Sequence, residues 1–406
     1  MATQMRKLLL LGGLGGATWG VAWSVLAPYL RGLGYSGTQY GLVGSTAVLS
    51  SALMTLLAGT LSDRIGARRV AAVGLLGQSL ALLLISTGEP VRVALGFFIN
   101  GASNALAFTS QQALVARTGS DERLHYTFSY VAASSTLGGA LGSFAGWLPV
   151  IASNRLGVSL LDAYRATLAL ASLLPLASAP VALSLREDLA PKRGSTASGW
   201  RRLGGGFAKI TLANVLIGFG AAMSIHNIDY YFSVKYNITS AQLGSVLGLQ
   251  QLLMAFLMTR IPRLADRAGS PLKVYLAVSY SSVPLLIAMT LVNNFPVAAA
   301  LYLVRSILMN VANPLFNAVV MRMVPRDLRG TASALLSLSW TLPAGGGRAV
   351  GGYLLDIDLE LPLRLTALLY TAALTYIAVV LPDATQESTR SSGTQTAGER
   401  LWSRPP

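Results

Sequence analysis

The side chains best placed for chemistry in this chain of 406 residues are a few ionisable groups inside otherwise apolar segments. His226 and Asp229 stand three positions apart in the segment 207–233, so they share one face of a helix. An imidazole beside a carboxylate titrates near neutral pH, and such a pair can relay a proton. Asp229 also lies about 33 Å along the helix from the start of the segment, where simple exposure to water is the alternative interpretation.

Arg305 is the most deeply placed charge, roughly 13 Å from the nearer end of the segment 296–321. An ionisable group near the centre of a membrane helix costs at least ~2.5 kcal/mol, so it is a functional candidate. With Asn310 and Asn313 it can offer a hydrogen-bonding wall to an anionic or polar substrate, or to a buried carboxylate. The alternative is a structural arginine that ties helices together through backbone carbonyls.

Two further sets of polar residues interrupt apolar segments. Arg348 is expected at a depth similar to that of Asp229, and the two can form an external gate or a structural ion pair. The fourth apolar segment carries amides in place of charge, among them Asn100 and Asn104. These residues complete a candidate pathway for a substrate or a proton.

Other kinds of chemistry lack the residues they need. The chain has no cysteine, which removes disulfide and thiol chemistry. No Gly-Lys pair occurs, so no phosphate-binding Walker sequence is present. His125 and His226 form neither a metal-binding nor a triad pattern. We therefore expect no enzyme activity, no metal and no cofactor.

Composition places the elements that position these residues in a lipid bilayer. Hydrophobic residues make up 53% of the chain and charged residues only 12%, whereas a soluble domain must cover its surface with polar groups. A membrane span needs about 20 apolar residues, and twelve segments meet that length. The expected spans are 8–30, 38–61, 69–87, 91–116, 127–150, 164–185, 207–233, 241–260, 273–292, 296–321, 330–355 and 363–382.

The chain is a duplicated unit. Asp63 and Asp266 are 203 positions apart, which is half of the chain length, and Gln39 and Gln242 precede them at equal distances. Each copy contains six of the expected spans. The predicted organisation is a first six-helix bundle at 1–186, a flexible cytoplasmic linker at 187–206, a second six-helix bundle at 207–382 and a disordered cytoplasmic tail at 383–406.

A charged loop follows the second expected span, and a shorter copy follows the eighth. The residues of the first are Gly59, Asp63, Arg64, Gly66, Arg68 and Arg69, and those of the copy are Asp266, Arg267 and Gly269. This pattern closely resembles the first loop motif of the major facilitator superfamily. The resemblance implies an all-α polytopic membrane protein in which two six-helix repeats enclose a midplane substrate site.

The resemblance also implies a role for the charged loop. By analogy with the family, the carboxylate of Asp63 is expected to face the positive end of a helix from the other half and to stabilise the outward-open state. The alternative is that these charges only fix the topology of the short loop.

Glycines recur at four-residue spacing in two spans. Gly138, Gly142 and Gly146 share one face of the fifth, and Gly347 and Gly351 share one face of the eleventh. They resemble the helices at which the two halves of family members meet, whereas tight packing without a hinge role is the alternative. The Gly-Pro signature that antiporters of the family carry in the fifth span is broken after Gly142.

The distribution of positive charge predicts orientation. The net charge is +15, and 23 of the 31 Lys and Arg residues fall on the side that holds both termini. The positive-inside rule puts that side in the cytoplasm. The basic balance therefore indicates membrane topology and no nucleic-acid partner.

These observations predict a monomeric secondary active transporter of the cell membrane that moves a small organic solute by alternating access, coupled to protons. Proton-coupled efflux of amphipathic or drug-like compounds is the first hypothesis, because the pattern resembles the drug-export branch of the family. Uptake of an organic anion or metabolite is the alternative, favoured by Arg305 and Arg348. A non-transporting membrane receptor is a third, more remote hypothesis.

Overall fold

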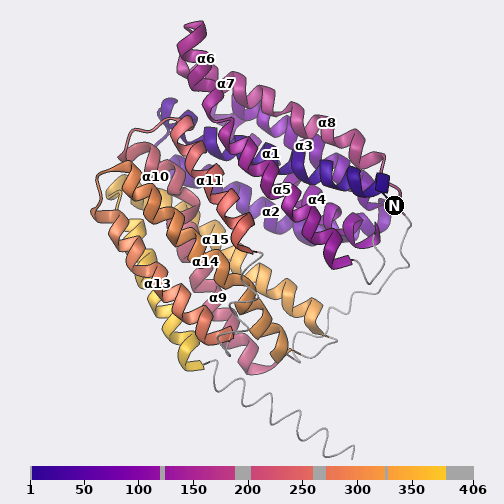
Figure 1. Cartoon of the computed structure of the whole chain (residues 1–406), viewed down its shortest axis with the longest axis vertical. Coiled ribbons are helices and arrows are strands. Elements are labelled where there is room, and N and C mark those ends of the chain that lie inside the picture. The colour runs from indigo at the N-terminus through magenta and orange to yellow at the C-terminus, as the bar shows by residue number, and fades with distance from the viewer. Residues whose placement is uncertain (1, 119–123, 188–202, 259–270, 325–327, 381–406) are drawn as a thin grey trace, which may run out of the picture.

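The structure is a computed structural model that describes residues 2–118, 124–187, 203–258, 271–324 and 328–380. Within these ranges the chain folds into long helices arranged as two bundles (Figure 1). The second charged loop, most of the expected linker and the expected tail lie outside the described residues.

The first bundle contains the helices up to residue 183, and a bend divides each of its last two expected spans into two helices. Its elements are α1 (Ala2–Gly32), α2 (Gly37–Ile65), α3 (Ala67–Ser86), α4 (Pro90–Thr118), α5 (Leu124–Phe144), α6 (Trp147–Leu156), α7 (Leu160–Ala171) and α8 (Leu173–Leu183).

The second bundle repeats this plan, with a short 3-10 turn inside its first span. Its elements are α9 (Gly204–Ser224), η3 (Ile225–Asn227), α10 (Ile228–Lys235), α11 (Ser240–Met258), α13 (Pro271–Leu291), α14 (Phe295–Met323), α15 (Arg329–Ile357) and a last helix at Leu361–Val380.

Each of the twelve expected spans coincides with one helix or one run of helices. By length and apolarity, nine of the described helical runs can cross a membrane, and α2 makes ten if its two parts, bent by 48°, count together. Of the other long helices, α14 counts only as a shorter apolar run at Phe295–Asn310, and α15, which carries Arg348 and many glycines, is not among the nine. A count of twelve spans therefore stays a prediction.

The repeated glutamines have the same structural role in the two halves. Gln39 caps the first turn of α2 by accepting a hydrogen bond from the Ser36 amide at 3.0 Å, and Gln242 accepts one from the Thr239 amide at 3.0 Å before α11. Such caps satisfy amides that have no partner inside the helix. The internal repeat thus marks equivalent helix starts.

The two bundles meet at one end of the molecule and spread apart toward the other (Figure 1). At the end where they meet, which we call the contact end, α2 packs on α15 and α5 packs on α11. One large core that includes Val25, Tyr40 and Leu243 runs through both bundles. A smaller core around Leu8 and Leu114 stays within the first bundle and lies far from the contact end.

Candidate functional site

A cavity of about 680 Å³ lies between the bundles. Its wall in the first half comes mainly from α1, α2, α3 and α4 and is rich in indole and amide groups. The second half contributes His226, Asp229, Gln251, Trp340, Thr341 and Arg348. This central position is where the resemblance noted in the sequence implies a substrate site.

A break in the helical run of the seventh expected span positions the ionisable residues of the cavity. The backbone switches to a 3-10 turn at Ile225–Asn227, and the amide of buried Asn227 donates hydrogen bonds to carbonyls freed there, including that of Met223 at 3.3 Å. The same amide donates to the Arg348 carbonyl of α15 at 3.1 Å. The break puts Asp229 in the first turn of α10, where the helix dipole favours a negative charge.

Asp229 is buried at the contact between the halves and is only 1% exposed. Its Oδ2 accepts a 2.5 Å hydrogen bond from the hydroxyl of Tyr40 in α2, and its Oδ1 accepts one from the Tyr230 amide at 2.8 Å. The guanidinium of Arg348 lies 5.5 Å from the centre of the Tyr40 ring. The expectation that Asp229 is simply exposed to water is therefore wrong, because α2 covers it.

His226 and Asp229 both reach the cavity, as their shared helix face predicts. The imidazole makes an edge contact with Trp340, with ring centres 5.4 Å apart. Within the described residues, Arg348 and Asp229 make no direct salt bridge, and the Tyr40 ring links them instead.

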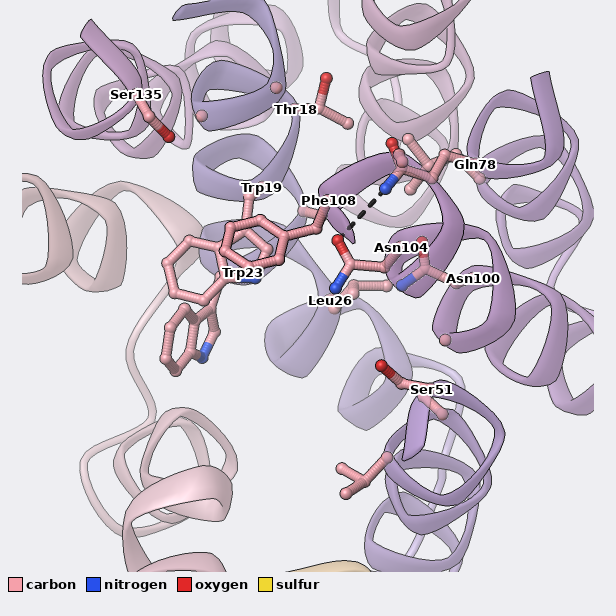
Figure 2. A pocket seen from close by; sticks show the side chains of 18 of the residues that line it. Thr18, Trp19, Trp23, Leu26, Ser51, Gln78, Asn100, Asn104, Phe108 and Ser135 are labelled. Atoms are coloured by element: carbon pink, nitrogen blue, oxygen red, sulfur yellow. Dashed lines mark hydrogen bonds between the residues drawn. The ribbon is translucent and has the colours of Figure 1, made fainter. Parts of the chain in front are cut away.

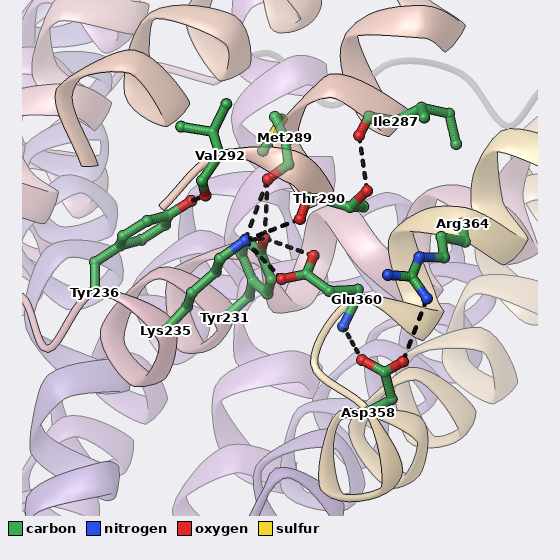
Figure 3. Close-up of polar contacts among 10 residues, drawn as sticks. All are labelled: Tyr231, Lys235, Tyr236, Ile287, Met289, Thr290, Val292, Asp358, Glu360 and Arg364. Atoms are coloured by element: carbon green, nitrogen blue, oxygen red, sulfur yellow. Dashed lines mark hydrogen bonds and ion pairs between the residues drawn. The ribbon is translucent and has the colours of Figure 1, made fainter. Parts of the chain in front are cut away.

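A second cluster of polar side chains holds α10 in place at the contact end (Figure 3). Lys235 pairs with Glu360 at 2.6 Å, and these side chains are 11% and 15% exposed. The Tyr231 hydroxyl donates to Glu360 at 2.9 Å and accepts from Lys235 at 3.0 Å. Because α10 carries Asp229, this cluster fixes the position of the buried carboxylate relative to the last helix.

Further hydrogen bonds close the contact end. Asp356, near the end of α15, accepts from the amides of Gly37 at 2.7 Å and Thr38 at 2.8 Å, and from the Thr38 hydroxyl at 2.6 Å. Arg31 of α1 donates to the Ser233 carbonyl and to the Asn237 side chain across the halves. A carboxylate of one half thus caps a helix start of the other.

Arg305 is buried in the second half and does not line the cavity. Its guanidinium donates to the Tyr370 hydroxyl at 3.1 Å and lies 5.5 Å from the centre of that ring. This partner is neither Asp229 nor a backbone carbonyl, the two protein partners considered from the sequence. The tyrosine comes from the last helix, so Arg305 joins α14 to it.

The candidate asparagines separate into two groups. Asn100 and Asn104 line the cavity, and Asn104 accepts a hydrogen bond from Gln78 at 3.3 Å (Figure 2). Asn310 instead donates to the Ser306 carbonyl of its own helix at 2.8 Å, and Asn313 is exposed outside the cavity lining. The structure therefore does not bring all four together.

Four of the five candidate glycines pack helices within a half. A Cβ on Gly138 or Gly142 would lie 2.0 or 2.2 Å from carbonyls of α1. Likewise, a Cβ on Gly347 or Gly351 would lie 2.3 or 1.9 Å from carbonyls of α9. The expected role at the meeting of the halves is thus corrected for these four, because their shared face points into their own bundle.

Neighbouring residues make the contact between halves instead. Gly146 would bring a Cβ within 2.4 Å of the Ser240 carbonyl, and Gly244 within 2.1 Å of the Ser143 carbonyl. Between α2 and α15, a Cβ on Gly352 would lie 2.7 Å from the Cα of Gly41.

The first charged loop lies at the end opposite to the contact end. Gly66 has a φ of +94° and starts α3, a conformation that side chains rarely adopt. Glu187 accepts from the amides of Ala67 at 2.7 Å and Arg68 at 3.1 Å. Glu187 therefore belongs structurally with the first half, one residue beyond the predicted boundary.

The other residues of this loop are more open. A Cβ on Gly59 would meet no described atom within 4 Å, and Asp63, Arg64 and Arg69 are exposed. Asp266, Arg267 and Gly269, the copy in the second half, lie outside the described residues.

Sequence reasoning missed Tyr40, Asp356 and Arg31. Tyr40 stands inside the repeated Gln-x-Gly pattern, where the second half has Leu243, and this difference between the copies was the available signal. Asp356 and Arg31 lie at the ends of expected spans, and no pattern distinguishes them from ordinary loop charges.

Comparisons with known proteins agree with this architecture. The family model of the Major Facilitator Superfamily matches residues 8–345 and 210–405. Quinolone resistance protein NorA of Staphylococcus aureus is 27% identical over 138 residues, which are 34% of this chain and 36% of NorA. An uncharacterised MFS-type transporter of Methanocaldococcus jannaschii is 22% identical over 82% of this chain and 86% of its own.

Solved transporter structures share the fold. The nucleoside transporter NupG superposes with a TM-score of 0.66 at 17% identity, covering 94% of this chain and 98% of its own. A bacterial homologue of the human lysosomal transporter Spinster, inward-facing and occupied, superposes with a TM-score of 0.71 at 13% identity, covering 96% and 97%.

Proposed function

Because the chain belongs to the Major Facilitator Superfamily, we propose that it exports amphipathic, drug-like compounds across the cell membrane in exchange for protons. Transport by alternating access is the property of this fold, in which two halves rock around a central site. The partial similarity to NorA, a quinolone resistance protein, favours export.

The observation that carries proton coupling is the hydrogen bond between Tyr40 and Asp229. It joins the halves at the end of the cavity through a buried carboxylate. A hydrogen bond to an ionised group contributes about 1.5–3 kcal/mol, roughly twice that of a neutral one. A proton on Asp229 therefore loosens the contact between the halves, and this links proton binding to the conformational cycle.

The orientation follows from the distribution of charge. The side with most Lys and Arg carries the first charged loop and the chain start, opposite to the contact end. If that side is cytoplasmic, the contact end faces outward. The described conformation is then closed to the outside, with Asp356 and Arg31 as the outer contacts.

Reconstitution into proteoliposomes tests the proposal. Norfloxacin, a quinolone, is expected to drive proton movement, reported by entrapped pyranine, whereas benzoate, an aromatic anion, is not. Asp229→Asn is expected to abolish this coupled proton movement while norfloxacin still exchanges for norfloxacin across the membrane. Norfloxacin transport without proton movement in the parent protein would overturn proton coupling, and coupled benzoate uptake would favour the import hypothesis.

A further inference from the structure

The wall of the cavity in the first half presents flat aromatic surface. Trp19 and Trp23 of α1 contact each other edge to face, with ring centres 4.0 Å apart. The Trp19 side chain is 50% exposed and Phe108 of α4 is 59% exposed, and both line the cavity. Figure 2 shows these rings directed into the space that Asn104 faces. Exposed indoles in a cavity are suited to stack on planar rings.

Beside the rings lies a set of uncharged hydrogen-bonding groups. Gln78, Asn100 and Asn104 come from α3 and α4, and a single 3.3 Å hydrogen bond joins the first to the last. A primary amide has two donor hydrogens and an acceptor oxygen with two lone pairs. This bond leaves most of these donors and acceptors available, so the wall can bind a partner that both donates and accepts.

The two charged groups of the cavity have opposite signs and lie on either side of Tyr40. Of the described residues that line it, Asp229 and Arg348 alone carry formal charges. Asp229 accepts from Tyr40 and Tyr230 and is 1% exposed, and Arg348 lies against the Tyr40 ring. A ligand with one net charge would therefore add an unbalanced charge to a cavity whose two protein charges offset each other, and an unpaired charge in an apolar site is costly.

From this lining we propose that the cavity takes an uncharged, planar heteroaromatic compound whose edges carry amide-like donors and acceptors. The ring would stack on the indoles of α1, and the edge would pair with the amides of α3 and α4. This inference rests on the proposed transport function, because it assigns the substrate class of the same site. It disfavours both a lipophilic cation and an organic anion.

Three tricyclic dyes of similar shape separate these classes. Riboflavin is uncharged and has an imide edge, FMN adds a negative phosphate to the same ring, and proflavine is a cation without amide groups. Titration calorimetry of the purified full chain in detergent is expected to give a dissociation constant at least tenfold lower for riboflavin than for the other two. Equal or tighter binding of FMN or proflavine would overturn the inference.

Variants at one amide test the assigned contacts. Asn104→Leu is expected to weaken riboflavin about tenfold, the effect of losing one good hydrogen bond. Asn104→Asp is expected to turn the preference toward proflavine, since it supplies the free carboxylate that the cavity lacks. Asn154→Leu, on an exposed position of α6 outside the cavity, is the matched control and is expected to bind like the parent.

The outcomes distinguish this inference from the proposed function. Riboflavin binding that Asn104→Leu leaves unchanged would refute the amide contact. Coupled norfloxacin transport with no riboflavin binding would refute the substrate class and leave export intact. Riboflavin binding with no proton movement driven by either riboflavin or norfloxacin would support the substrate class and refute proton-coupled export.

Discussion

Tyr40 and Asp229 are 189 positions apart in the sequence, yet a 2.5 Å hydrogen bond joins their side chains between the two halves. The Tyr40 side chain stacks on the Tyr230 ring, with centres 4.9 Å apart, so the hydroxyl is held in place. The bond therefore reports directly on whether the contact end is closed.

Removing the hydroxyl of Tyr40 tests the contact without changing a charge. We expect Tyr40→Phe to destabilise the closed contact end by about 1–3 kcal/mol, because it leaves the Asp229 carboxylate with one partner fewer. Cysteines placed at Leu49 of α2 and Gly345 of α15, where a Cβ on Gly345 would lie 2.7 Å from Leu49 Cγ, should cross-link less in this variant than in the parent. Tyr280→Phe, whose hydroxyl is exposed and bonds within the second half, is the control. Unchanged cross-linking in Tyr40→Phe would contradict the role of the bond.

Asp356 gives a second test at the contact end. Asp356→Asn keeps the size of the side chain but loses the negative charge that caps α2, an interaction of about 0.3–1 kcal/mol. We expect the variant to spend more time open at this end, so that Ser45→Cys, at a buried position between α2 and α15, reacts faster with a membrane-impermeant maleimide. Asp358→Asn, whose carboxylate bonds within the second half, should leave the rate unchanged.

The charged loop at the opposite end is expected to balance the two states. Asp63→Asn should slow transport while leaving substrate affinity nearly constant, because the hypothesis assigns Asp63 to the conformational equilibrium and not to the cavity. Asp266→Asn should have a milder effect, since its loop lacks the second pair of arginines. Transport rates measured under a proton gradient test this assignment. A parental rate for Asp63→Asn would refute a role of Asp63 in the conformational equilibrium.

A pair of glycine variants separates packing within a half from contact between halves. Gly142→Leu should lower thermal stability, because its side chain would meet the α1 backbone, and overpacking costs about 1–3 kcal/mol. Gly244→Leu should instead weaken the contact between α11 and α5 and spare the fold of each bundle. Unfolding followed in detergent, together with cross-linking at the contact end, measures both. Equal loss of stability in the two variants would contradict the assignment.

Arg305 is expected to stabilise the second half by holding α14 against the last helix through Tyr370. Arg305→Met and Tyr370→Phe should each destabilise the second half, and a double-mutant cycle should give a coupling of about 1 kcal/mol. Arg305→Lys should retain part of the stability through its charge near the ring. Riboflavin affinity should stay at the parental value in these variants, because Arg305 lies outside the cavity. A selective loss of riboflavin affinity at parental stability would place Arg305 in the substrate pathway.

The sequence by itself determined the helices and their duplication. Long apolar runs must form helices in a bilayer, since the backbone has no other partner there. The equal spacing of Gln39 and Gln242 before the two charged loops predicted a duplicated unit, and both residues cap a first turn. These features depend on residues close together in the chain, so local pattern is sufficient to find them.

Only the tertiary structure decided which faces meet. Gly142 points into its own bundle whereas the next residue, Ser143, meets the other half, because one step along a helix turns the side chain by about 100°. In the same way, depth along a helix suggested that Asp229 meets water, but the packing of α2 covers it with Tyr40. Helix rotation and the register between the halves result from packing across the whole molecule, which spacing within one segment does not encode.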